Sequence, residues 1–243
     1  MNFGNFAVSQ LVLPDAFTQE FSQALAAGHR GEWQVPDLAP VIMEGPPSRN
    51  VLLLAHGAGA GHDSPFLLEW RAALARAGVQ TLSFEFAYLR EMRAAGRRRP
   101  PPRVARLVEE MRLWRDVLSQ MVPGALWLGG KSMGGRVASL LAAEDGAPGL
   151  VLAGYPFHPV GKPERLRLDH WPSLACPLVV LQGTRDPFGT RDEVAGYELP
   201  AHARLEWLED GDHDWSPRRL SGLSRQDLMA KAARATADAM SKS

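Results

Sequence analysis

The chain has 243 residues, and its 27 Lys and Arg residues balance its 27 Asp and Glu residues, so the formal net charge is zero. This balance argues against a protein that coats nucleic acid or binds anionic membranes, because both need an excess of basic residues. A hydrophobic fraction of 45% with 22% charged residues is typical of a globular protein and argues against extensive disorder.

The single cysteine, Cys176, excludes both an internal disulfide and a cysteine-based zinc site. The apolar runs are far shorter than the roughly 20 residues that span a bilayer, so we expect no membrane insertion. No Lys or Arg precedes Arg30, and polar residues interrupt the N-terminal apolar stretch, which argues against a signal peptide. We therefore expect a cytoplasmic protein.

The first 50 residues show only a weak hydrophobic pattern for predicting helices and strands. An apolar segment at 6–13 precedes a helix-like stretch at 17–27, which ends before Gly28. The stretch 36–50 contains four prolines and predicts a connecting loop, with a short edge strand at 41–43.

The pattern becomes regular at Val51–Ala55, a continuous apolar run typical of a strand buried on both faces. A glycine-rich turn follows, and then helical spacing at 65–77 with Ser64 or Asp63 as N-cap and Pro65 at the first helical position. The alternation continues to the C-terminus. Further strands are predicted at 79–84, 125–128, 150–153, 178–181 and 204–208, and further helices at 103–120, 134–144, 191–196 and 223–240.

Strands that alternate with helices predict an α/β fold with a mostly parallel sheet covered on both faces. No repeat or linker divides the chain, so we predict one domain over residues 1–243, with a motif-bearing core at 51–215. Ligands in such sheets lie beyond the carboxyl ends of the strands. The interval 154–177 is short and proline-rich, so we expect no substantial lid.

The strongest motif follows the strand at 125–128. Gly130, Ser132 and Gly134 form G-x-S-x-G between a predicted strand and a predicted helix, the context of a nucleophile elbow. The Met133 backbone N–H then lies at a helix N-terminus, where it can stabilise an oxyanion. A P-loop would need glycine at Ala125, and a dinucleotide fingerprint would need glycine at His62, so neither nucleotide site is expected.

Two further side chains complete a catalytic triad. Asp186 follows the strand at 178–181 and is the predicted acid, with Asp192 as the alternative. His213 follows the strand at 204–208 and is the predicted base. The order Ser132, Asp186, His213 is the order of serine, acid and histidine in α/β-hydrolases. We expect no metal and no cofactor.

The glycine-rich loop after the first core strand predicts the second oxyanion donor. Ala58 is the expected donor, with Gly59 as the next choice and a lining residue of the pocket. His62 is predicted to line the pocket as well, whereas His56 is expected to pack the loop.

The motifs HGAGAGHDSPF, FEFAY, GGKSMGGR, QGTRDPFG and GDHDW resemble the KANL/testis-expressed-type α/β-hydrolase-like family over about residues 51–215. They are also similar, more distantly, to dienelactone-hydrolase-like esterases. The resemblance implies the α/β-hydrolase fold, with Ser132, Asp186 and His213 as the triad, and it implies no particular substrate.

The interval from Arg90 to Asp116 holds nine arginines and four acidic residues. It forms either a solvated helix face and loop or a surface that attracts an anionic substrate or partner. We expect an open pocket whose substrate contacts come from five residues, namely Tyr88, Arg97, Arg98, Phe157 and His158.

The sequence therefore predicts a serine hydrolase that cleaves an ester or thioester of a small acyl substrate. The alternative is a non-catalytic interaction module on the same fold, which would use the arginine-rich interval to hold a partner.

Overall fold

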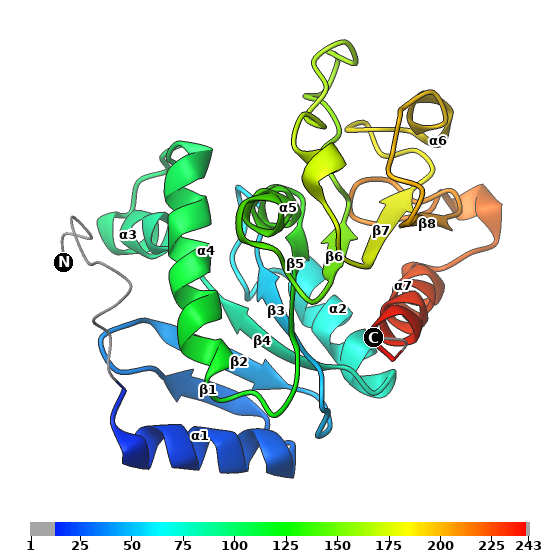
Figure 1. Cartoon of the computed structure of the whole chain (residues 1–243). Helices are drawn as coiled ribbons and strands as arrows, with labels where there is room; N and C mark the ends of the chain where they lie inside the picture. The colour runs from blue at the N-terminus through cyan, green and yellow to red at the C-terminus, as the bar shows by residue number, and fades with distance from the viewer. Residues whose placement is uncertain (1–12, 242–243) are drawn as a thin grey trace.

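The computed structural model describes residues 13–241, so the apolar segment predicted at 6–13 falls almost entirely outside the described residues. One eight-stranded sheet with the order β1-β2-β4-β3-β5-β6-β7-β8 runs through the molecule (Figure 1). The strands are β1 (Gly31–Gln34), β2 (Pro40–Glu44), β3 (Val51–Ala55), β4 (Gln80–Phe84), β5 (Leu126–Lys131), β6 (Leu150–Ala153), β7 (Leu178–Gly183) and β8 (Ala203–Leu208).

Six strands, from β4 to β8 across the sheet, are parallel, whereas β1 and β2 pair antiparallel at one edge. The helices are α1 (Asp15–Ala27), α2 (Pro65–Arg76), α3 (Ala87–Ala95), α4 (Val104–Ser119), α5 (Met133–Asp145), α6 (Arg191–Val194) and α7 (Arg225–Met240). This arrangement confirms the predicted α/β-hydrolase fold.

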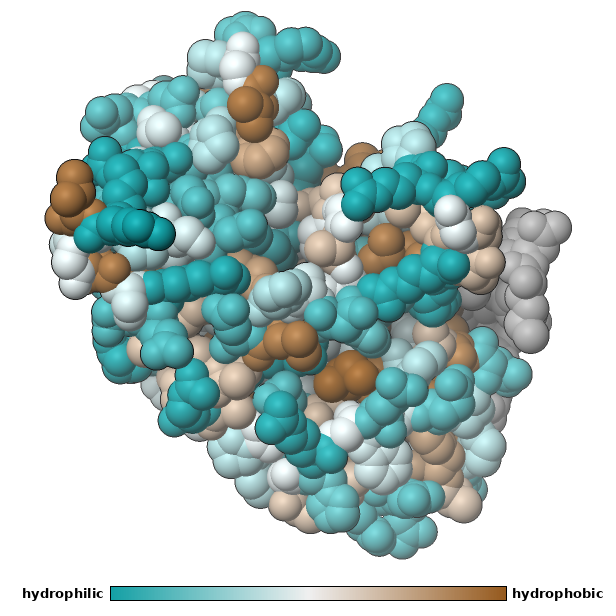
Figure 2. Space-filling model, turned by 180° about the vertical axis from the view of Figure 1, so that it is seen from behind, coloured by the Kyte–Doolittle hydropathy of each residue, from teal (hydrophilic) through white to brown (hydrophobic). Residues whose placement is uncertain are grey.

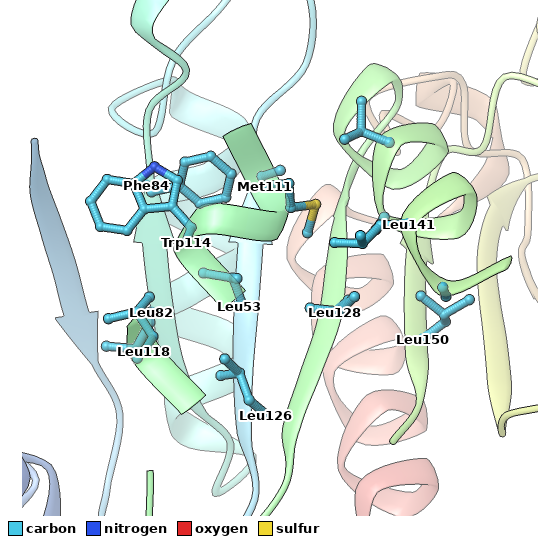
Figure 3. Packing of buried hydrophobic residues seen from close by; sticks show 14 of the residues in the cluster. Leu53, Leu82, Phe84, Met111, Trp114, Leu118, Leu126, Leu128, Leu141 and Leu150 are labelled. Carbon is cyan, nitrogen blue, oxygen red and sulfur yellow. The ribbon is translucent and has the colours of Figure 1, made fainter. Parts of the chain in front are cut away.

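The sheet separates two hydrophobic clusters. On one face, side chains of α1, α4 and α5 pack on the sheet, and Figure 3 shows Trp114 of α4 against Phe84 and Met111 of α4 above Leu53. On the other face, α2 and α7 cover residues such as Trp127. The central strands are fully buried on both sides, which explains their unbroken apolar sequence.

Local signals define the helix ends on the second face. The Ser64 side chain accepts a hydrogen bond from the Leu67 N–H at 3.3 Å, and Pro65 occupies the first turn of α2. Ser64 is therefore the N-cap of α2, and Asp63 instead forms an ion pair with Arg93.

The structure corrects two parts of the sequence prediction. The stretch predicted as a loop with an edge strand contains β2, which lies inside the sheet between β1 and β4, and the edge strand is β1. The helix α3 was not predicted, because only Ala87 and Leu89 of its nine residues are buried. Gly96, which ends α3 in the left-handed conformation at φ 60°, was the available signal for it.

None of the helices in residues 13–241 combines the length and apolarity that crossing a membrane requires. Between β6 and β7 the chain forms only loops and a single 3-10 turn, η2 (Trp171–Ser173), in agreement with the expected lack of a large lid. The view from behind in Figure 2 shows hydrophobic residues in small separate groups among hydrophilic ones.

Candidate active site

Ser132 lies in a strained turn between β5 and α5. Its backbone has φ 52° and ψ −113°, a conformation that non-glycine residues rarely adopt. Hydrogen bonds hold the turn on both sides, because the Ser132 N–H donates to the Ala153 carbonyl at 2.8 Å and its own carbonyl accepts from the Arg136 N–H at 3.0 Å. The turn leaves the Ser132 side chain partly exposed at the carboxyl end of the sheet.

Gly130 and Gly134 of the motif are required because the backbone of α5 approaches β3 and β5 closely at these two positions. A Cβ on Gly134 would lie 2.7 Å from the Ala55 carbonyl carbon and from the His56 oxygen, and a Cβ on Gly130 would lie 2.6 Å from the Gly134 carbonyl carbon. Both contacts are shorter than real Cβ atoms make, so α5 can approach β3 and β5 only without these side chains.

Asp186 and His213 form a hydrogen-bonded pair. The Asp186 Oδ2 lies 2.8 Å from His213 Nδ1, and its Oδ1 accepts the Phe188 N–H at 2.9 Å. Asp186 is fully buried, so its carboxylate is held in one orientation. The alternative acid, Asp192, is exposed on α6.

This geometry fixes the histidine tautomer. A carboxylate at Nδ1 favours the proton on that nitrogen, which leaves Nε2 free to accept a proton. The His213 ring packs against Phe188, with 4.5 Å between ring centroids, and its side chain is 23% exposed.

Lys131 connects the nucleophile turn to the loop that carries His213. Its side chain is 7% exposed, and its Nζ donates to the His213 carbonyl and lies 3.3 Å from Asp214. The Nζ also lies 4.6 Å from the centroid of the Phe66 ring. Burial lowers the pKa of Lys131, and the charge of Asp214 opposes that shift.

His56 orders the loop after β3, as the sequence predicts. Its Nδ1 lies 2.7 Å from the Gly57 carbonyl, and its Nε2 accepts the Phe86 N–H at 3.0 Å. Burial lowers the pKa of His56 to about 4, so the ring is neutral at pH 7 and both hydrogen bonds form.

Ser132, His213 and Ala58 line one cavity of about 500 Å³. Its walls combine apolar and charged side chains, namely Pro65, Phe66, Leu67, Phe188, Lys131, Asp214 and Arg225. Gly59 lies on the same cavity, and Met133 begins α5 beside it with no side-chain cap on the helix N-terminus. A cavity of this size accommodates a small acyl substrate.

The structure places several predicted substrate contacts away from this cavity. Phe157 is fully buried against Tyr155 and Trp171, and His158 is 1% exposed with its Nδ1 at 2.9 Å from the Pro159 carbonyl. Both are buried in the packing around the loop after β6, and neither lines this cavity.

Four other predicted contacts also lie outside the cavity lining. Arg97 and Arg98 are exposed in the loop that follows α3, and neither lines the cavity. The His62 carbonyl accepts from Arg71 at 2.5 Å, and burial lowers the pKa of the His62 ring. The Tyr88 hydroxyl donates to the Ala58 carbonyl at 2.8 Å.

The sequence analysis did not identify three residues that line the cavity, Phe66, Leu67 and Arg225. Phe66 and Leu67 belong to the first turn of α2, directly after the glycine-rich loop, and that adjacency was the available signal. Arg225 begins α7 far along the chain, and only the tertiary packing of α7 against α2 brings it to the cavity.

No group of three or more His, Cys, Asp or Glu residues within the described part of the chain is arranged to hold a metal ion.

Comparison with known proteins finds solved structures of the same fold. A similar solved structure is Est1E from Butyrivibrio proteoclasticus, with 13% identity, a TM-score of 0.64, and coverage of 88% of this chain and 99% of that chain. Dienelactone hydrolase from Anabaena variabilis is similar at 19% identity and a TM-score of 0.61, covering 88% and 98%. A serine hydrolase without a lid from Xanthomonas campestris is similar at 17% identity and a TM-score of 0.59, covering 84% and 93%.

At these identities the solved structures establish the fold. The family follows from a separate match, because the model described as an alpha/beta hydrolase domain matches residues 48–241, most of the chain. The chain therefore belongs to the α/β-hydrolase domain family.

Proposed function

We propose that this protein is a serine hydrolase that cleaves an ester or thioester of a small acyl substrate. One observation carries the proposal: the strained Ser132 and His213, which is hydrogen-bonded to the buried Asp186, line the same cavity. The names of the similar structures, among them an esterase domain from Rhodothermus marinus, support the same class.

The reaction follows from the roles of these groups. Ser132 Oγ attacks the acyl carbonyl carbon while His213 Nε2 takes its proton, and Asp186 stabilises the imidazolium that forms. The tetrahedral oxyanion accepts hydrogen bonds from the Met133 and Ala58 N–H groups. The carbon–oxygen or carbon–sulfur bond then breaks, and His213 returns the proton to the leaving group.

Water completes the cycle by the same steps. His213 takes a proton from a water molecule, the hydroxide attacks the acyl-enzyme, and Ser132 leaves with the proton returned from His213. The mechanism uses no cofactor. We also propose that, within the α/β-hydrolase family, the protein is related to the KANL/testis-expressed-type proteins that its motifs resemble.

The test is labelling with a fluorophosphonate probe, which reacts with activated serines. We expect labelling of the wild type and of Ser119→Ala, an exposed serine on α4, and no labelling of Ser132→Ala. Absence of Ser132-dependent labelling in folded protein would favour a non-catalytic interaction module instead. A panel of activated esters that differ in acyl length and charge then identifies the substrate class.

A further inference from the structure

The backbone of residues 57–60, in the loop after β3, has little packing to hold it in place. Gly61 is closely packed against Glu85 and Arg93, whereas a Cβ added at Gly59 would meet no atom within 4 Å. At Gly57 the nearest atom would lie at 3.8 Å. Because glycine also has the greatest conformational freedom, this loop needs hydrogen bonds from outside to keep one conformation.

Two side chains supply such hydrogen bonds. His56 Nδ1 holds the Gly57 carbonyl at 2.7 Å, and the Tyr88 hydroxyl donates to the Ala58 carbonyl at 2.8 Å. Among residues 13–241 there is no backbone–backbone hydrogen bond to Ala58, Gly59 or Ala60. The Tyr88 hydroxyl therefore makes a direct hydrogen bond to the backbone of Ala58, the residue that the proposed function assigns as an oxyanion donor.

Tyr88 comes from α3, which is fixed to the same loop at its two ends. At the start of α3 the Phe86 N–H donates to His56 Nε2, and near its end Arg93 pairs with Asp63 at 2.5 Å. The Tyr88 ring lies 6.1 Å from the His56 ring. The phenol is thus presented to the loop by a helix that is itself docked there.

The Tyr88 phenol stays protonated and can therefore donate this hydrogen bond over a wide pH range. Burial raises the pKa of Tyr88 to about 12, so the hydroxyl keeps its proton throughout the neutral and moderately basic range. A hydrogen bond to a carbonyl needs that proton, because a phenolate can only accept.

We propose that Tyr88 is a positioning residue for the oxyanion hole. His56 holds the Gly57 carbonyl, whose peptide carries the Ala58 N–H, and Tyr88 holds the Ala58 carbonyl in the next peptide, so the peptides on both sides of Ala58 are fixed. The inference rests on the proposed hydrolase function. Tyr88 does not line the cavity, so it acts through Ala58 and not by touching substrate. With both neighbouring carbonyls held, rotation of the backbone at Ala58 is limited, and an oxyanion donor is effective only when its direction is fixed before the reaction.

The chain offers a matched pair of variants. Tyr88→Phe removes the one hydroxyl that binds the loop. Tyr197→Phe makes the same chemical change at a buried hydroxyl that has no hydrogen-bond partner among the described residues. Both variants keep the aromatic ring, so each should fold, and circular dichroism with thermal melting confirms it.

The kinetic measurement compares an activated ester with the corresponding thionoester, in which sulfur replaces the carbonyl oxygen and fits an oxyanion hole poorly. For Tyr88→Phe we expect kcat on the ester to fall about tenfold with KM unchanged. The ratio of kcat/KM for ester to thionoester should fall as well. Tyr197→Phe should keep the wild-type kcat on the ester and the wild-type ratio. A merely structural effect would lower kcat/KM for both substrates by the same factor and leave their ratio unchanged.

A second measurement does not depend on activity. Hydrogen exchange of the peptide that contains residues 56–64 should be faster in Tyr88→Phe than in the wild type and in Tyr197→Phe.

The outcomes separate this inference from the proposed function. Wild-type protein that shows no Ser132-dependent hydrolysis would overturn both. If hydrolysis depends on Ser132 but Tyr88→Phe stays within about twofold of wild type with the same ester-to-thionoester ratio, the role of Tyr88 is overturned alone. Unchanged exchange in the loop would also overturn it.

Discussion

At the scale of single residues, the site depends on a few groups whose protonation and direction are set by their neighbours. Asp186 receives a backbone N–H and an imidazole from opposite sides of one buried carboxylate. His56 is buried as a neutral ring that donates on one side and accepts on the other. Each arrangement leads to a prediction that one substitution can test.

The acid of the triad is tested by two matched substitutions. Asp186→Asn should lower kcat by about 10³- to 10⁴-fold, because the amide no longer holds His213 in the tautomer that accepts the serine proton. Asp192→Asn removes an exposed carboxylate on α6 and should leave kcat close to wild type. Initial rates on one activated ester measure both, and a larger loss for Asp192→Asn would contradict the assignment.

The buried His56 makes stability depend on pH. Its folded-state pKa of about 4 lies below the ordinary value of 6.5, so the unfolded chain binds a proton that the folded chain does not between these values. The free energy of unfolding should therefore fall by about 3 kcal/mol as the pH drops from 6.5 to 4 through this group alone.

His56→Gln removes that contribution and should give a shallower loss of unfolding free energy on acidification than the wild type. His202→Asn, an exposed histidine, serves as the control. Burial also lowers the pKa of His170 to about 4 and raises that of Glu110 to about 7, so the comparison with wild type isolates His56. Equal slopes in urea unfolding at pH 4.5 and 6.5 for variant and wild type would refute the role of His56.

At the scale of elements, the nucleophile turn depends on the contact of α5 with β3. Gly134→Ala would place a Cβ against the Ala55 carbonyl, so we expect α5 to shift, with a loss of about 1–3 kcal/mol in unfolding free energy and a lower kcat. Gly196→Ala is the matched control, because its Cβ would meet only an ordinary contact at 3.5 Å. Urea unfolding measures both, and a Gly134→Ala protein as stable and active as wild type would disprove the need for close approach.

The sequence predicted elements well where a local pattern and the tertiary environment agree. The buried strands β3 and β7 and the N-cap region of α2 were found from apolar runs and from the Ser64–Pro65 pair. The helix α3 was missed because it packs mainly through hydrogen bonds and an ion pair to a loop that is distant in sequence. A pattern of burial cannot reveal contacts of that kind.

The site residues likewise divide into those that local motifs indicate and those that only tertiary packing determines. The structure pairs His213 with Asp186 and places Ser132 and His213 on one cavity, and the order of motifs along the chain had indicated these three residues. The predicted substrate contacts Phe157 and Arg97 do not reach the cavity, because loop direction depends on packing that local sequence does not encode. Arg225 reaches it through the contact of α7 with α2.

At the scale of the whole molecule, the N-terminal unit and the catalytic end of the sheet are separate. The helix α1 lies beside the opposite end of the sheet from the loops that carry the site (Figure 1). Residues 13–47 fall outside the family match at 48–241, although Phe21 of α1 is fully buried against Trp33 of β1, with 5.7 Å between ring centroids.

Phe21→Ala should therefore lower the free energy of unfolding by about 3–5 kcal/mol through loss of buried ring contacts. The same protein, assayed below its melting temperature, should keep kcat/KM near the wild-type value, because α1 does not contribute to the cavity. Thermal melting and ester hydrolysis measure the two effects, and a large fall in kcat/KM with intact folding would show that the N-terminal unit shapes the site.

The central claim is that Ser132 forms an acyl-enzyme. An activated ester is mixed with enzyme, quenched in acid within the first turnover, and the protein is examined by intact mass and peptide mapping. We expect a burst of one leaving group per chain and one acyl group on the peptide that contains Ser132, with neither in Ser132→Ala. Hydrolysis without a burst or adduct, or an acyl group on another residue, would contradict it.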